Sequence, residues 1–250
     1  MTTTTTTTHG VKEEIHSSAL SVASSSTSCT LNESTVFHPS HILTVDAQGI
    51  AALRLPLPSR QTEILIYHAD GGEAYVSRRD KHWSGNAVLS HPKRGDLIRT
   101  QYFFGPNRDP VLHLLQAADR ESVAVTGKWT SRATRFEMPG AQSFEWEYVK
   151  EKRANGQKVS LIVLKVVAEK GDSQGHDIRI AQLVRGSDSR TPGTSRCTAG
   201  NGGELQIDRA ALQSVGLDEA MVVATCLMML KKEIDRRRMM QMAAIGGAGS

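Results

Sequence analysis

The feature that most constrains this chain is an unbroken run of small and apolar residues, Ala220 to Leu230. Thr225 and Cys226 are its only mildly polar members, so a helix over this run has no polar face. Such a helix is either buried on all sides or lies in a bilayer. As an α-helix the run would rise only about 16 Å, about half of a hydrocarbon core of about 30 Å. The run therefore predicts a helix buried in protein and no transmembrane span.

Charges at both ends of the run indicate how far this helix extends, from Leu217 to about Met240. Asp218 and Glu219 lie where its first turn would be, and a basic cluster lies in its last turns. Both signs match the helix macrodipole. Residues 245–250 are rich in glycine and are expected to be a flexible end. The basic cluster consists of Lys231, Lys232, Arg236, Arg237 and Arg238.

Between His41 and the helix, about a dozen short runs alternate apolar and polar residues and are separated by turn-forming residues. Turn signals stand at 69–72 (ADGG) and 154–157 (ANGQ), and residues 159–167 are apolar on both faces, as in a central strand. Evenly spaced strands without intervening helices indicate a sandwich or a barrel. With the buried helix, the pattern predicts a mainly β fold over residues 38–244: a closed antiparallel β-barrel of about 12 strands around a C-terminal α-helix.

Two stretches lack any periodicity. Residues 1–37 are rich in Thr and Ser and predict a disordered tail. The tail has neither the basic start nor the continuous apolar core of a secretory signal, and Glu13 and Glu14 argue against a mitochondrial presequence, so a cytoplasmic location is expected. Residues 185–203 are rich in Gly, Ser, Thr and Arg and predict a flexible loop before the last strand.

The charge balance leaves the nature of the partner open. The formal net charge is +4, and residues 1–35 carry −2, so the remainder carries +6. This excess suits contact with an anionic surface, and equally suits a mildly basic domain without such a partner. Cys29, Cys197 and Cys226 lie far apart, without a CxxC or a His at ligand spacing, so neither a disulfide framework nor a metal site is predicted. No cofactor is expected.

Three stretches carry a resemblance to a known family: 95–110 (GDLIRTQYFFGPNRDP), 127–140 (GKWTSRATRFEMPG) and 143–149 (SFEWEYV). Together with the order of strands and helix, they resemble the tubby C-terminal-like domain, which tubby proteins, phospholipid scramblases and LURP-one-related proteins share, and its fungal members in particular. The resemblance covers residues 41–240. It implies a 12-stranded barrel around a central helix and, for some members, binding of phosphoinositides through basic side chains. The lipid-binding Lys and Arg pattern of tubby proteins has no residue-by-residue match here, and the scramblase-specific segments are not visible.

Basic side chains are accordingly the candidate lipid-binding residues. Lys and Arg can hold phosphate oxygens, and Arg can do so in a bidentate manner. The alternative is a structural role, with Asp96, Asp109 and Glu137 as nearby partners or with the helix end as a solvated last turn. The candidates are Arg99, Arg108, Lys128, Arg132, Arg135, Lys231, Lys232, Arg236, Arg237 and Arg238.

Other functional classes have weaker support in the sequence. The pairs His68–Asp70 and His91–Asp96 are of the type that serves general base catalysis, but no catalytic motif accompanies them, so no enzyme is predicted. The three Trp residues are assigned to the core, and no nucleic-acid partner is expected. The prediction is a monomeric, intracellular, non-enzymatic protein that contacts anionic, phosphoinositide-like membrane lipid at a membrane surface. The alternative is a protein–protein interaction module without a lipid role.

Overall fold

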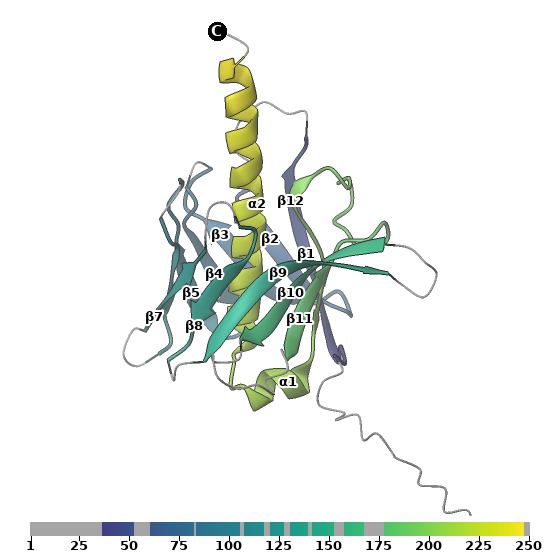
Figure 1. Cartoon of the computed structure of the whole chain (residues 1–250). Helices are drawn as coiled ribbons and strands as arrows, with labels where there is room; N and C mark the ends of the chain where they lie inside the picture. The colour runs from purple at the N-terminus through teal and green to yellow at the C-terminus, as the bar shows by residue number, and fades with distance from the viewer. Residues whose placement is uncertain are drawn as a thin grey trace, which may run out of the picture. The chain divides into compact units, whose positions relative to one another are not determined.

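The computed structural model describes residues 37–52, 61–82, 84–105, 108–117, 121–127, 131–139, 142–152, 158–167 and 178–247. They lie within one compact unit, residues 34–250. Twelve antiparallel strands close into a barrel, and a long helix, α2 (Glu219–Gly247), runs through it (Figure 1). The predicted mainly β fold, a closed barrel around a C-terminal helix, is therefore confirmed.

Each strand pairs with its neighbours in the chain, and β1 pairs with β12 to close the ring, with His41 opposite Ile207. Closure leaves no unpaired edge among these strands. The strands are β1 (His41–Ile50), β2 (Glu63–His68), β3 (Glu73–Arg79), β4 (Ala87–His91), β5 (Gly95–Gln101), β6 (Val111–Leu114), β7 (Ser122–Thr126), β8 (Thr134–Glu137), β9 (Ser143–Lys152), β10 (Lys158–Val167), β11 (Arg179–Val184) and β12 (Ala199–Ile207).

The core lies between the inner face of the barrel and α2. Successive side chains of a strand point to opposite faces, so every second residue enters the core. In β7, Val123 and Val125 are buried whereas their neighbours are exposed. These side chains pack in one cluster with the apolar run of α2, where Val222 and Val223 are fully buried. The helix thus supplies the interior that strand side chains alone would not fill.

The helix differs from the prediction at both of its ends. It begins at Glu219 rather than Leu217, and it continues past Met240 to Gly247, so residues 245–247 are helical. Its last turns project beyond one end of the barrel, which we call the exit end (Figure 1). There Met240 and Ile245 are 58% and 57% exposed.

A short helix, α1 (Arg209–Ser214), lies at the opposite end of the barrel and was not predicted (Figure 1). Asp208 caps it, because its Oδ1 accepts a hydrogen bond from the Ala211 amide at 3.0 Å. The six residues of α1 are too few to give the periodic apolar pattern by which longer helices are recognised.

Two boundaries in the predicted strand and loop pattern were wrong. Strand β12 begins at Ala199, so residues 199–203 belong to the sheet and not to the preceding loop. The sequence pattern predicts separate strands at 41–46 (HILTVD) and 49–58 (GIAALRLPLP), whereas Gly49 and Ile50 belong to the end of β1. Residues 53–60, the tail up to residue 36 and the turn at 154–157 lie outside the described residues; the strands on either side of that turn, β9 and β10, pair with each other as predicted. Within the described ranges, no helix has the length and apolar character needed to span a bilayer.

Candidate functional site

The basic cluster of α2 divides among three sides of the helix. Each residue advances the helix by about 100°, so positions three or four apart lie on the same side. Lys231 and Arg238 therefore lie beside Asp235, with Nζ and Nη1 at 2.6 and 3.6 Å from its Oδ1. Lys232 and Arg236 lie on another side, and both line a pocket at the exit end.

We call this pocket the basic pocket. Its cavity volume is about 40 Å³, within a hollow of about 480 Å³ that includes open solvent. Three segments form it: the connection from β5 to β6, the connection from β7 to β8 with the start of β8, and α2. Their lining residues are Tyr102, Phe103, Gly105, Arg108 and Asp109, then Gly127, Ser131 and Thr134, then Lys232 and Arg236.

The basic pocket has an excess of positive charge. Arg108, Lys232 and Arg236 line it, and Asp109 is the one acidic side chain among its described lining residues. None of the three cations forms an ion pair or a side-chain hydrogen bond with any residue that the structure describes. Burial lowers the pKa of Lys232, the Asp109 carboxylate acts in the opposite direction, and Arg236 lowers the pKa further. An anion in the pocket would relieve the repulsion between these cations.

Gly127 and Thr134 place the β7–β8 side of the basic pocket against the helix. A Cβ atom at Gly127 would lie 3.0 Å from the Ala133 carbonyl oxygen and 3.5 Å from Lys232 Nζ, so glycine leaves room for the ammonium group. The Thr134 hydroxyl lies 2.9 Å from the sulfur of Met229, to which it donates a hydrogen bond. The wall that faces the cations is thus in close contact with α2.

Two exposed aromatic side chains lie in the connection after β5, and one of them, Phe103, lines the basic pocket. Phe103 and Phe104, in the connection after β5, are 41% and 46% exposed. Large apolar side chains at the surface next to cations are the combination with which peripheral proteins contact a lipid surface.

Arg108, Lys232 and Arg236 are the predicted site residues that the structure brings together. Lys231 and Arg238 instead pair with Asp235, as described above. Arg237 is half-buried and does not line the basic pocket. The sequence could not divide this cluster, because neighbouring positions on a helix point in different directions.

None of the remaining predicted residues that the structure describes lines the basic pocket. Arg99 is exposed on the outer face of β5. Arg135 forms an ion pair with Glu145 at 3.1 Å across the β8–β9 pair. The Arg132 guanidinium lies 5.5 Å from the centre of the Tyr148 ring. Lys128 lies outside the described residues.

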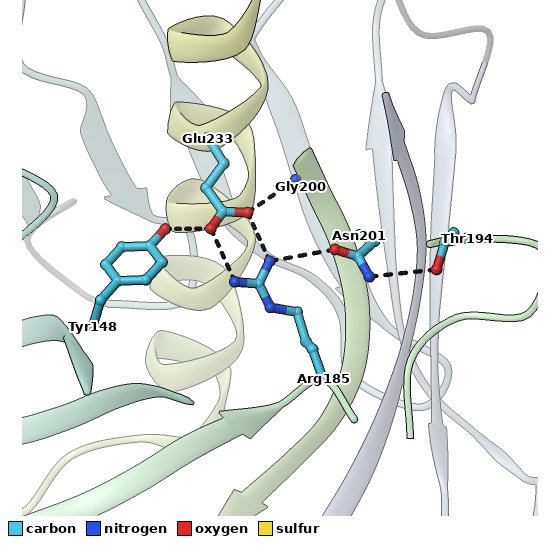
Figure 2. A network of polar contacts seen from close by, with 6 residues as sticks. All are labelled: Tyr148, Arg185, Thr194, Gly200, Asn201 and Glu233. Atoms are coloured by element: carbon cyan, nitrogen blue, oxygen red, sulfur yellow. Dashed lines mark hydrogen bonds and ion pairs between the residues drawn. The ribbon is translucent and has the colours of Figure 1, made fainter. Parts of the chain in front are cut away.

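A polar network around Glu233 of α2 was not predicted (Figure 2). The Glu233 carboxylate accepts hydrogen bonds from Arg185 at 2.7 and 2.9 Å, from the Tyr148 hydroxyl at 2.5 Å and from the Gly200 amide at 2.9 Å. Arg185 also donates to Asn201, at 3.4 Å. The network joins three strands or loops to α2, and its members are far apart in sequence, so no local pattern reveals it.

The other candidates from the sequence have structural surroundings. The Nδ1 atom of His91 accepts hydrogen bonds from the amides of Lys93 and Arg94, and Asp96 accepts one from Ser90. Among the residues described, no hydrogen bond joins His91 to Asp96 or His68 to Asp70.

Of the three Trp residues, Trp146 is the one that the structure describes. It is fully buried, and its indole N–H donates to the Thr225 hydroxyl at 3.0 Å. Trp83 and Trp129 lie outside the described residues. The assignment of Trp146 to the core is therefore confirmed.

Comparisons of the chain with protein-family models, curated proteins and solved structures find no match. The case for a functional site therefore depends on the geometry and charge of the basic pocket.

Proposed function

We propose that this protein is a non-enzymatic binding protein that contacts anionic, phosphoinositide-like membrane lipid through the basic pocket. The observation that carries the proposal is the set of three cations without ion-pair partners among the described residues, Arg108, Lys232 and Arg236. They surround a hollow whose described lining holds one carboxylate, that of Asp109.

The chemistry of these side chains fits a phosphorylated headgroup. The two guanidinium groups can each donate two parallel hydrogen bonds to phosphate oxygens, and the ammonium group adds a compact charge. A group with two or more negative charges would neutralise the excess charge of the pocket. Phe103 and Phe104 would then enter the boundary between headgroups and acyl chains. The interaction would bring a cytoplasmic protein to a membrane surface.

The architecture supports placing the chain in the tubby C-terminal-like superfamily, which is part of the proposal. A twelve-stranded barrel closed around a C-terminal helix is the arrangement that the resemblance implies. Because one fold serves many functions, the argument for lipid binding depends on the basic pocket and not on the fold.

A protein–protein interaction module is the second candidate. The last turns of α2 favour it, because Met240, Met242 and Ile245 are exposed outside the barrel. A partner that covers these side chains would need no contact with the basic pocket.

Vesicle co-sedimentation of the full chain tests the proposal. The vesicles would contain phosphatidylcholine alone, or with phosphatidylserine, or with a phosphoinositide, each at low and raised salt. We expect salt-sensitive binding to the acidic vesicles. Replacing Arg108, Lys232 and Arg236 by Gln should weaken binding about 100-fold, because each cation near an anionic surface contributes about 1 kcal/mol.

A matched control removes the same number of charges elsewhere. Arg99, Arg135 and Arg209 are exposed residues on the outer wall or at the opposite end of the barrel. Their replacement by Gln should leave most of the binding. Equal losses in the two triple variants would show that net charge, and not the basic pocket, determines binding. If the wild-type protein bound to none of the acidic vesicles, the proposal would be overturned and a protein partner would be favoured.

A further inference from the structure

A second hollow, the inner cavity, lies inside the barrel between α2 and strands β1 to β5. It has a cavity volume of about 50 Å³ within a hollow of about 640 Å³ that includes open solvent. Tyr102 lines both this cavity and the basic pocket, so the two hollows adjoin there, while their other described lining residues differ.

Small residues on the strands create the inner cavity. Ala47 of β1, Ala87 of β4 and Gly85 before β4 line it where other inward positions carry large side chains. Opposite them, Leu227 and Met228 of α2 form an apolar wall. A chain of methylene groups would find apolar contact on both sides of this space.

Arg79 introduces a positive charge at this apolar space. Along β3, the inward positions are Tyr75, Ser77 and Arg79, since side chains alternate between the two faces of a strand. Both Ser77 and Arg79 line the inner cavity, and Arg79 is half-buried.

The Arg79 guanidinium forms no ion pair or hydrogen bond with any residue that the structure describes. The carboxylate that attracts it, Asp235, is already 2.6 Å from Lys231 Nζ. Burial and the nearby Arg238 lower the pKa of Arg79, and Asp235 acts in the opposite direction.

Lys231 is the second cation at the inner cavity, and none of the cavity's lining residues that the structure describes is acidic. A half-buried guanidinium without a carboxylate partner, next to an apolar wall, lacks the counter-charge that buried cations normally have. The missing counter-charge and the apolar wall together describe a ligand with one anionic end and one apolar end.

We propose that the inner cavity binds a short linear aliphatic carboxylate, with its carboxylate on Arg79 and Lys231 and its alkyl chain along Leu227 and Met228. The cavity volume of about 50 Å³ corresponds to about four water molecules, so a chain of about four to six carbons fits inside. A longer chain would extend through the mouth. This proposal does not depend on lipid binding by the basic pocket.

A chain-length series on the full-length protein tests the apolar part of the proposal. Acetate, butyrate, hexanoate and octanoate would be titrated by calorimetry and by spectra of the methionine methyl groups, where the Met228 signal reports on the inner cavity. Affinity should rise about 4-fold for each added methylene up to hexanoate, and then level off. Hexanol should bind at least 10-fold more weakly than hexanoate. No response to any carboxylate, or equal affinity for hexanol, would overturn the assignment.

Adjacent arginines supply a matched pair of variants for the charged part. Arg79→Met should weaken hexanoate binding at least 10-fold. Arg78→Met should change it less than 2-fold, because Arg78 points outward and pairs with Glu63. Equal effects of both variants would contradict the role of Arg79.

A third variant keeps the test decisive if Arg79→Met does not fold. Ala87→Leu adds volume inside the inner cavity, and should abolish the dependence on chain length while the protein remains folded by circular dichroism. Unchanged chain-length dependence would place the ligand elsewhere.

The triple variant of the basic pocket should bind hexanoate like the wild type, and Arg79→Met should still sediment with acidic vesicles. The two proposals can therefore fail independently.

Discussion

The Arg185 guanidinium donates two hydrogen bonds to the Glu233 carboxylate, at 2.7 and 2.9 Å, where α2 approaches the exit end of the barrel. Both side chains are largely buried, with 14% and 13% of their surface exposed. Arg185 follows directly after β11, so this pair holds the helix against the chain segment between β11 and β12.

Removing one member of this pair should be costly, because the other charge would remain buried without a partner. We expect Glu233→Gln or Arg185→Met to lower the free energy of unfolding by about 3 kcal/mol or more, measured by urea denaturation. The double variant should lose less than the sum of the two. The Arg135–Glu145 ion pair is the control: Arg135 is 58% exposed, and Arg135→Gln should cost under about 1 kcal/mol. Equal losses at the two pairs would show that burial of the Glu233 pair does not matter.

The same carboxylate predicts a pH dependence of stability. Burial raises the pKa of Glu233, but the Arg185 hydrogen bonds and charge, together with the hydrogen bonds from Tyr148 and the Gly200 amide, bring it below the ordinary value of 4.5. Because the folded-state pKa of Glu233 is the lower one, the unfolded chain binds a proton at this carboxylate more readily than the folded chain does. The contribution of Glu233 to the free energy of unfolding is therefore complete above pH 4.5 and is lost as the pH falls through the folded-state pKa. The difference in unfolding free energy between wild type and Glu233→Gln should be constant from neutral pH to about 5 and should then shrink. A difference that stayed constant at lower pH would contradict this.

Close packing between β12 and α2 predicts a strong effect at Gly200. Its φ is +72°, and a Cβ atom there would lie 2.6 Å from the Leu230 carbonyl oxygen and 2.4 Å from Ile234 Cγ1. Gly200→Ala should therefore cost about 2–5 kcal/mol, from backbone strain and overlap together. Gly193 has a φ of +77° with nothing within 4 Å, so Gly193→Ala should cost only the strain, about 1–2 kcal/mol. Thermal unfolding of both variants would separate the two contributions, and equal midpoints would contradict the close contact.

Two methionines of α2 test which part of the helix is interior. Met228 is 3% exposed and Met240 is 58% exposed. Met228→Asp should remove cooperative unfolding, because it places an unpaired charge in the core, whereas Met240→Asp should change the free energy of unfolding by less than about 0.5 kcal/mol. Leu227→Asp should be milder than Met228→Asp, since Leu227 is half-buried beside the inner cavity. Circular dichroism during heating would distinguish the three. A folded Met228→Asp variant at wild-type stability would exclude a buried helix.

The sequence was sufficient for the architecture because each element carries its own periodic signal. The run Ala220 to Leu230 has no polar face, and burial inside a barrel satisfies it; strands such as β7 alternate strictly. These are local patterns. The start of β12 was predicted as a loop because glycines such as Gly200 and Gly202 are typical of loops. In the structure these two glycines allow β12 to approach α2 and β1 closely.

The site was only partly predictable because it depends on contacts between distant segments. Lys231 and Lys232 are neighbours in sequence, but one lines the inner cavity and the other the basic pocket. Asp109 and Lys232 approach each other only after β5, β6 and α2 are in place. Arg78 and Arg79 are adjacent arginines, so residue type does not distinguish them. Only the pairing of β3 decides which of the two points inward.

The threading of α2 through the barrel has a consequence for the order of events during synthesis. The helix follows all twelve strands in the chain, and the first strand pairs with the last, so a growing polypeptide exposes the whole inner wall of the sheet before the segment that covers it has emerged. Such a chain cannot acquire its fold one strand at a time, and its contacts between distant residues favour slow folding. During this interval the protein would depend on chaperones that bind exposed apolar strands, whatever the stability of the finished barrel.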